Sequence, residues 1–178
     1  MARPRLTGVL LVGGASTRFG SPKALARLGD ETLAERAWRV LGEACDERLA
    51  VGKRRDGLEL PFAIVDDGTE TRAALAGIVA GLRAARTELA VVLPVDTPLV
   101  TAELLRTLAA ACGDAAVTQM GPLPAALRRT ALPVLERRLL AGELALHEAL
   151  DELGAVQVDI DARLLVNVNT ADELRRLG

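Results

Sequence analysis

Short apolar runs alternate along this chain with longer segments in which apolar residues recur every three or four positions. The short runs have the length of buried β-strands, and the longer segments have the periodicity of amphipathic helices. Strands and helices that alternate in this way are typical of βα units, in which helices cover both faces of a sheet. We therefore predict an α/β fold, a three-layer α/β/α sandwich around a mostly parallel central sheet.

The first half of the chain contains the clearest elements. Leu6–Val12 and Leu89–Val95 are mostly apolar, as expected of strands that are buried on both faces. Thr101 is a suitable N-cap for a helix that runs through Cys112. The other strands predicted here are Arg48–Val51 and Pro61–Val65, and the other helices are Thr32–Cys45 and Thr71–Ala85.

The second half is less regular. Met120-Gly121-Pro122 indicates a turn between two strands, and Gly142 separates two helices. No repeat, low-complexity segment or linker divides the 178 residues, so we predict a single domain, residues 1–178. The strands predicted in this half are Ala115–Gln119, Leu123–Arg128, Val156–Ile160 and Leu164–Val168, and the helices are Ala131–Leu140, Glu143–Leu153 and Thr170–Leu177.

The composition excludes several classes of protein. Half of the residues are apolar, 26% are charged, and the formal net charge is −2. General nucleic-acid-binding proteins usually carry a basic surplus, and a membrane span needs about 18 consecutive apolar residues, more than any run here provides. Cys45 and Cys112 have no partner at a disulfide or zinc spacing, which fits a reducing compartment. We expect a cytoplasmic globular protein that binds neither nucleic acid nor membranes.

Two residue types are rare in this chain. Of the 22 basic residues 20 are Arg, so Lys23 and Lys53 are its two lysines, and Asn occurs only as Asn167 and Asn169. Whatever bias removed these residue types elsewhere left these four in place. We give them additional functional weight for that reason.

A glycine-rich loop follows the first predicted strand, with the sequence Gly13-Gly14-Ala15-Ser16-Thr17-Arg18, and Lys23 lies a few residues beyond it. Glycines after a strand allow backbone N–H groups to approach phosphate oxygens, and Arg18 and Lys23 add charged donors. The loop matches neither the Walker A motif nor G-x-G-x-x-G. It predicts a site for a nucleoside triphosphate; the alternative is an ordinary βα turn with two solvated cations.

Asp96 stands at the end of the strongest predicted strand, in Leu93-Pro94-Val95-Asp96-Thr97-Pro98-Leu99. Ligands of open α/β sheets bind beyond the carboxyl ends of the strands. A single carboxylate there suits Mg²⁺, which typically takes one or two carboxylates together with substrate phosphates. We predict that Asp96 binds Mg²⁺; the alternative is that it only begins a turn before Pro98.

Two other polar motifs follow predicted strands. Asp66-Asp67-Gly68 can accept hydrogen bonds from a base or a ribose, or can simply form a turn. The segment with Asn167 and Asn169 precedes the last helix, where Asn169 or Thr170 is expected to serve as the N-cap. Capping does not account for both asparagines.

These residues resemble a known family. LLVGGASTRFGSPKAL is similar to the signature loop of the GT-A-like sugar-phosphate and cofactor nucleotidyltransferases, L-x-G-G-x-S-x-R-M-G-x-x-K-A-L. Further segments resemble, in order and spacing, the molybdenum cofactor guanylyltransferases of the MobA type: ALAGIVAGL, LPVDTPLV, GPLPAALRRTALPVLERRLLAGELALHEALDELGA and VNVNTADEL. The likeness extends from about Leu6 to Leu177, nearly the whole chain.

The resemblance implies a Rossmann-like GT-A fold and transfer of GMP from GTP to molybdopterin, or to its molybdenum-loaded form, with release of pyrophosphate. It implies Mg²⁺ as cofactor and transient contacts with the proteins that deliver and receive the molybdenum cofactor. It also implies roles for the matching residues. Arg18, Lys23 and Asp96 are the expected catalytic residues; Leu11, Val12, Gly13, Gly14, Lys23, Asp67 and Asp96 are expected to bind GTP, Asp96 to bind the metal, and Asn167 and Asn169 to lie near the cofactor or the metal.

The chain departs from the family pattern at two places that concern the base. Pro22 replaces the usual aspartate before Lys23, and Ser-Pro-Lys is more usual in the cytidylyltransferase relatives. Those relatives have Ala-Ala-Gly where this chain has Val12-Gly13-Gly14, which favours guanine. Val51-Gly52-Lys53 stands where the family has an asparagine in the base site. The open alternatives are a molybdopterin cytidylyltransferase, a sugar-phosphate nucleotidyltransferase, and a non-catalytic nucleotide-binding or cofactor-carrier protein.

Overall fold

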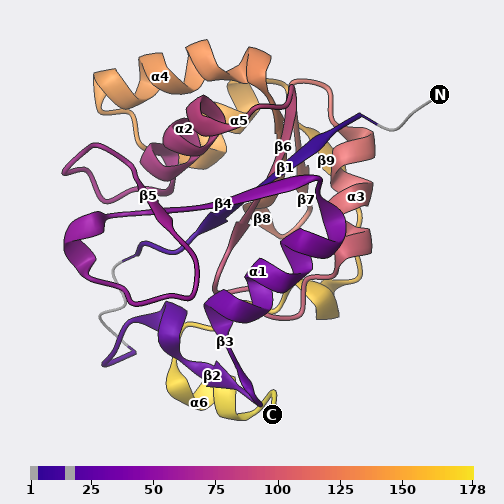
Figure 1. The fold of residues 1–178 in the computed structure, drawn as a ribbon. Helices are drawn as coiled ribbons and strands as arrows, with labels where there is room; N and C mark the ends of the chain where they lie inside the picture. Colours follow the sequence, from indigo (N-terminus) through magenta and orange to yellow (C-terminus); the bar gives the residue numbers. More distant parts are fainter. Residues whose placement is uncertain (1–3, 15–18) are drawn as a thin grey trace.

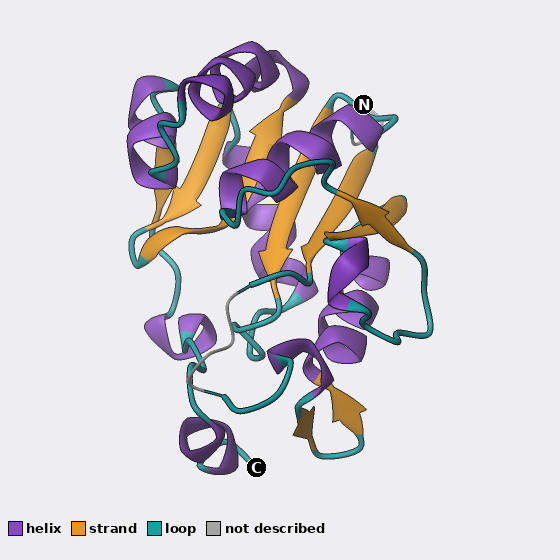
Figure 2. Ribbon diagram, turned by 90° about the vertical axis from the view of Figure 1, so that its left-hand side faces the viewer, coloured by secondary structure: helices purple, strands orange, loops and turns teal. Residues whose placement is uncertain are grey.

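The computed structural model describes residues 4–14 and 19–178, and its centre is a twisted sheet with helices on both faces (Figures 1 and 2). The strand order is β5-β4-β1-β6-β8-β7-β9. Within this described sheet β8 is antiparallel to both of its neighbours, whereas the other strands run in one direction. The strands are β1 (Leu6–Leu11), β4 (Glu47–Gly52), β5 (Ile64–Asp66), β6 (Leu89–Pro94), β7 (Ala115–Thr118), β8 (Gly121–Arg128) and β9 (Val156–Val158).

The helices form two outer layers. They are α1 (Leu33–Ala44), α2 (Ala74–Ala84), α3 (Ala102–Ala111), α4 (Leu132–Ala141), α5 (Leu146–Glu152) and α6 (Ala171–Arg175). One layer contains α1 and α3, and the other contains α2, α4 and α5 (Figure 1). No helix in the described part of the chain is both long and apolar enough to cross a membrane.

Two hydrophobic cores lie on opposite faces of the sheet and explain why the central strands are apolar. In β1, Leu10 packs into the core with α1 and α3, while its neighbours Val9 and Leu11 pack into the core with α2. Leu93 and Val92 of β6 divide in the same way. Because consecutive side chains point to opposite faces, a strand covered on both sides needs apolar residues throughout. The predicted three-layer α/β/α fold is confirmed.

Helix α2 lies unusually close to the sheet, and its glycines explain this. A Cβ on Gly81 would lie 2.5 Å from Val9 Cγ1, and one on Gly77 would lie 2.9 Å from Leu11 Cδ2. Distances below 3.0 Å would force the helix and strand apart. The two glycines therefore let α2 pack closely on β1, Gly77 against Leu11 at the end of the strand and Gly81 against Val9.

Side-chain caps begin three of the helices. Thr32 and Thr170 each form a capping box, with Glu35 and Glu173 respectively. Thr101 accepts a hydrogen bond from the backbone N–H of Leu104 at 3.2 Å, so its predicted role as N-cap is confirmed. Since Thr170 caps α6, the side chain of Asn169 is left for another partner.

The predicted strand Leu164–Val168 is wrong. A 3₁₀ helix, η4 (Ala162–Leu165), occupies its first part, and the backbone then continues without regular structure. The backbone N–H of Val168 donates to the carbonyl of Asp96 at 2.8 Å rather than to a strand. Leu165 and Val168 are apolar because they are buried in the core with α1 and α3. A short apolar run cannot distinguish this kind of burial from a strand.

Smaller differences concern boundaries. Strand β5 begins at Ile64, later than the predicted Pro61, and Gly121 and Pro122 belong to β8, so the turn before β8 lies at Gln119 and Met120. The short hairpin of β2 (Arg27–Leu28) and β3 (Glu31–Thr32) was not predicted from the pattern.

Candidate active site

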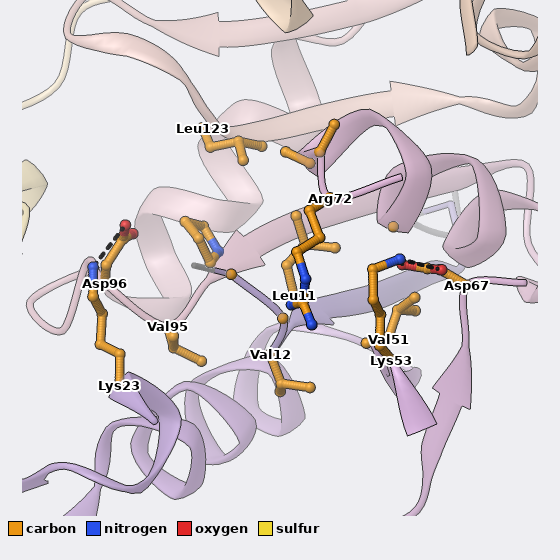
Figure 3. Close-up of a pocket in the computed structure, with 17 residues that line it drawn as sticks. Leu11, Val12, Lys23, Val51, Lys53, Asp67, Arg72, Val95, Asp96 and Leu123 are labelled. Carbon is orange, nitrogen blue, oxygen red and sulfur yellow. Dashed lines mark hydrogen bonds and ion pairs between the residues drawn. The ribbon is translucent and has the colours of Figure 1, made fainter. Parts of the chain in front are cut away.

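A cavity of about 330 Å³ opens where the carboxyl ends of β1, β4 and β6 meet the start of α2 (Figure 3). Small-molecule sites usually measure roughly 300–1,000 Å³ and lie at this edge of open α/β sheets. The predicted nucleotide-binding residues that line the cavity are Leu11, Val12, Gly13, Gly14, Lys23, Asp67 and Asp96. Arg18, the remaining predicted catalytic residue, lies outside the described residues.

The floor of the cavity depends on close approach between the segments that follow β1 and β4. A Cβ on Gly52 would lie 2.8 Å from Val12 Cγ2, and one on Gly13 would lie 3.6 Å from the Cα of Gly52. Val12 is also held in place, because its N–H donates to the carbonyl of Val51 at 3.0 Å. Because these glycines have no side chains, the two segments pack closely and their backbone is exposed to a ligand in the cavity.

Lys23 and Asp96 face each other at one end of the cavity (Figure 3). Lys23 Nζ lies 3.7 Å from Asp96 Oδ2, and it donates to Oδ1 of Asn169 at 3.2 Å. Burial raises the pKa of the Asp96 carboxyl above its usual value, and the charge of Lys23 opposes that shift. The bond from Val168 to the Asp96 carbonyl holds the C-terminal segment against this end. Three segments that are distant in sequence therefore form one polar group.

The two asparagines singled out by their rarity differ in position. Both are exposed and neither lines the cavity, but the side chain of Asn169 accepts a hydrogen bond from Lys23. The backbone N–H of Asn169 donates to Oε2 of Glu173 at 2.6 Å, which orients the residue. Proximity to the metal or cofactor end is thus supported by a contact for Asn169, and for Asn167 it stays a prediction.

Lys53 and Asp67 form a second ion pair at the opposite end of the cavity (Figure 3). Lys53 Nζ donates to Oδ1 and Oδ2 of Asp67 at 2.9 and 3.0 Å and to the carbonyl of Thr69 at 2.6 Å. The side chains of Lys53 and Asp67 are 6% and 7% exposed. A charged pair this deeply buried is unusual and stands at the wall of the cavity.

The adjacent aspartates of Asp66-Asp67-Gly68 have separate roles. Asp66 accepts from the backbone N–H groups of Arg54 and Gly68 at 2.7 and 2.8 Å, and these bonds hold the pKa of its carboxyl below the usual value. Asp66 is therefore the turn-forming residue of the motif. Asp67 is the residue that faces the cavity.

Arg72 lies between the two ends of the cavity (Figure 3), and its role there is not predicted from the sequence. Its guanidinium makes two hydrogen bonds to Asp56, at 2.6 and 3.2 Å. Nothing distinguishes Arg72 from the other arginines in the sequence. Lys53 was also absent from the predicted site, although the scarcity of lysine pointed to it, and both lysines of the chain in fact line this one cavity.

The described residues contain no group of three or more His, Cys, Asp or Glu side chains arranged to hold a metal ion. Asp96 and Asp67 are the carboxylates that line the cavity, and Asp67 forms an ion pair with Lys53. Asp96 is more open, with 26% of its side chain exposed. A single accessible carboxylate fits a Mg²⁺ ion whose other ligands are phosphate oxygens and water, and it does not fit a metal held by protein alone.

Fold and site together define a nucleotidyltransferase of the α/β class. The chain belongs to the family of the MobA-like NTP transferase domain, whose family model matches residues 8–170. The class of enzyme predicted from the sequence and the resemblance to this family are both confirmed.

Individual proteins agree with this assignment. The chain is 36% identical over 198 residues to a molybdenum cofactor guanylyltransferase of Burkholderia ambifaria, covering 98% of this chain and 96% of that protein. It is similar to the crystal structure of molybdopterin-guanine dinucleotide biosynthesis protein A from Archaeoglobus fulgidus, with a TM-score of 0.81 and 26% identity over 96% of both chains. A cytidylyltransferase, the 2-C-methyl-D-erythritol 4-phosphate enzyme of Thermus thermophilus, shares the fold with a TM-score of 0.73 and 21% identity over 96% of both chains. The fold alone therefore does not select the base.

Proposed function

We propose that this chain is a molybdenum cofactor guanylyltransferase, which transfers GMP from GTP to molybdopterin and releases pyrophosphate. Its product would be the molybdopterin guanine dinucleotide cofactor. The observation that carries the proposal is the single cavity that collects both Lys–Asp pairs at the carboxyl edge of the sheet. Relatives that share more than 30% identity over nearly the whole chain bear this enzyme's name.

The charges of the cavity suggest how GTP would lie. Lys23, Arg72 and the backbone of Gly13 and Gly14 are suited to the phosphates, because cations and exposed N–H groups bind phosphate oxygens. The base would then extend to the buried end, where Asp67 can accept from its N–H groups. The start of α2 lies beside the cavity, and the positive end of a helix dipole also favours an anion there.

Asp96 would hold Mg²⁺, which would neutralise charge on the nucleotide phosphates when bound. Lys23 lies within ion-pair distance of the same carboxylate, so the metal and the lysine would contact neighbouring phosphate oxygens of the nucleotide. The test of metal dependence is simple. Pyrophosphate release should stop after chelation with EDTA and return on addition of Mg²⁺.

The reaction needs little proton transfer from the protein. A phosphate oxygen of molybdopterin attacks the α-phosphorus of GTP in line, a P–O bond forms, and the bond to the β-phosphate oxygen breaks. The attacking phosphate is already largely ionised at neutral pH, so positioning and charge neutralisation dominate. Lys23, held by Asn169, would stabilise the charge that grows on the leaving pyrophosphate, and Arg18 would act in the same way.

The acceptor would meet GTP at the Lys23–Asp96 end, with Asn167 and Asn169 beside it. We expect transient contacts with proteins that deliver and receive the molybdenum cofactor, and a cytoplasmic location. Neither nucleic acid nor a membrane is needed for this reaction.

A nucleotide panel tests the proposal. The protein is incubated with molybdopterin, Mg²⁺ and GTP, CTP, ATP or UTP, and pyrophosphate is measured. Turnover with GTP is expected. Preference for CTP would instead support the cytidylyltransferase, the candidate that Pro22 before Lys23 favours, and nucleotide binding without pyrophosphate release would identify a non-catalytic binding protein.

A further inference from the structure

The chain contains two lysines, both at the same cavity and both paired with an aspartate, but the pairs differ in construction. Lys23 lies 3.7 Å from Asp96, an ion-pair distance beyond a hydrogen bond. Lys53 Nζ lies 2.9 Å from Asp67 Oδ1, and the side chains of both residues are less than 10% exposed. The Lys23–Asp96 pair can separate so that each residue contacts a substrate. The Lys53–Asp67 pair is expected to stay intact when a ligand binds.

Stability alone is a poor explanation for the buried pair. Removing two charges from water is unfavourable, and well-packed apolar residues at such positions are often equally stable or more so. The pair is moreover not enclosed in a core, because Lys53 and Asp67 both line the cavity. Their position therefore suggests a role in binding the ligand.

The hydrogen bonds show which partner can contact that ligand. Lys53 has three N–H groups, and its acceptors are the two carboxylate oxygens of Asp67 and the carbonyl of Thr69. Lys53 can thus donate to a ligand only by giving up one of these bonds. Asp67 Oδ1 accepts from Lys53 and from the N–H of Thr69 at 3.1 Å, whereas Oδ2 accepts from Lys53.

A carboxylate offers about four acceptor positions, so Asp67 keeps unused capacity on Oδ2. Lys53 and Thr69 fix the plane of the carboxylate from the protein side, and the remaining capacity is therefore presented in a fixed direction. Guanine has neighbouring N–H donors at N1 and at its 2-amino group. Adenine has no proton at N1, and hypoxanthine, the base of ITP, lacks the 2-amino group.

We propose that Lys53 is a positioning residue that determines base specificity: it holds the Asp67 carboxylate in the orientation in which the remaining acceptor position of Oδ2 receives a hydrogen bond from the 2-amino group of guanine. This inference rests on the proposed function, since it requires GTP as the nucleotide.

The experiment compares base selectivity with stability. The ratios of kcat/KM for GTP over ITP and GTP over ATP are measured with molybdopterin and Mg²⁺, and Tm is measured alongside. Lys53→Met keeps a long side chain and removes the charge; it should lower both ratios about tenfold or more, because Asp67 loses its fixed orientation. It should also lower Tm, because Asp67 is left without its buried partner.

Two further variants separate specificity from folding. Lys53→Met/Asp67→Leu removes both charges and should regain most of the lost Tm without regaining base selectivity. Arg138→Met is the matched control, because Arg138 is 8% exposed and bonds Glu148 and Glu152 between α4 and α5, on another part of the protein. It should lower Tm and leave both ratios unchanged.

The outcomes are distinct. Unchanged ratios in Lys53→Met, or ratios that recover with Tm in the double variant, would overturn the inference. If Lys53→Met fails to fold, Lys53→Arg decides, because it keeps a charge beside Asp67 but changes the geometry of the donors: lowered ratios support the inference, and unchanged ratios overturn it. Failure of the unaltered protein to use GTP refutes the proposed function instead, and the inference about guanine falls with it.

Discussion

The two ends of the cavity use the same pair of residue types for different tasks. At the Lys23–Asp96 end the side chains are 15% and 26% exposed and 3.7 Å apart, and at the Lys53–Asp67 end they are 6% and 7% exposed and 2.9 Å apart. Water screens the more open pair more strongly, whereas breaking the buried pair leaves an uncompensated charge. The open end is therefore suited to chemistry and the closed end to recognition. Substitutions at the two ends should therefore affect different measurements.

Lys23→Ala tests the open end and should have the largest effect on turnover. Loss of one charge-stabilising contact should lower kcat on the order of 10²–10³-fold, and Asp96→Ala should lose as much, measured by pyrophosphate release. The free energy of unfolding in urea should change less for Lys23→Ala than for Asp67→Ala, because the Lys23–Asp96 pair is the more open of the two. Arg163→Ala, which removes a 90% exposed cation, serves as control and should keep normal turnover. Near-normal turnover in Lys23→Ala or Asp96→Ala would refute the role given to that residue.

Asp67→Ala tests the closed end and should lower stability and the preference for GTP, rather than kcat. Lys53 would be left buried without a carboxylate, which costs about 3–5 kcal/mol in the free energy of unfolding. Urea denaturation measures this directly. A loss below about 1 kcal/mol would show that the two ends do not differ in the way their burial indicates.

Arg72→Ala tests the cation between the two ends. We expect kcat/KM for GTP to fall about tenfold through loss of a phosphate contact. Stability should hardly change, because the pair with Asp56 is 43% exposed on the Arg72 side. Asp56→Ala removes the partner but keeps the guanidinium, so it should not weaken GTP binding. Equal losses in the two variants would show that the ion pair itself matters, rather than a contact from Arg72 to GTP.

Asn169→Ala should have the smallest effect. Its hydrogen bond to Lys23 is long, at 3.2 Å, and such a bond contributes about 0.5–1.5 kcal/mol, or roughly two- to tenfold in kcat. Asn167→Ala, on an exposed residue of the same segment, is the comparison. A larger loss in Asn167→Ala would indicate that the acceptor, and not Lys23, is the main partner of this segment.

The sequence predicted most of the fold because its central elements follow simple patterns. Strands β1 and β6 are buried on both faces, and so their apolar character appears directly in the sequence. Leu164–Val168 has the same local pattern but does not form a strand. Leu165 and Val168 are buried in the core, and the N–H of Val168 bonds to the carbonyl of Asp96. A local pattern cannot report that distant partner.

The site was predictable where motifs stand next to strand ends, and not where it depends on neighbouring strands. Lys23, Asp67 and Asp96 follow recognisable signals, and all three line the cavity. The pairing of Lys53 with Asp67 depends on β4 lying beside β5, which the sequence did not reveal. Arg72 lines the cavity because the segment before α2 lies beside the ends of β1 and β4, an arrangement that the local sequence does not show.

The bond between Val168 and Asp96 has a consequence for the order in which the protein becomes active. Lys23 and Asn169 are 146 residues apart, and the ribosome makes the part that contains Asn169 long after the glycine-rich loop and β6. A nascent chain at that earlier stage already has the residues for holding a nucleotide, but the backbone of Asp96 and the amine of Lys23 still lack their late partners. Docking of this segment is thus among the final steps of maturation.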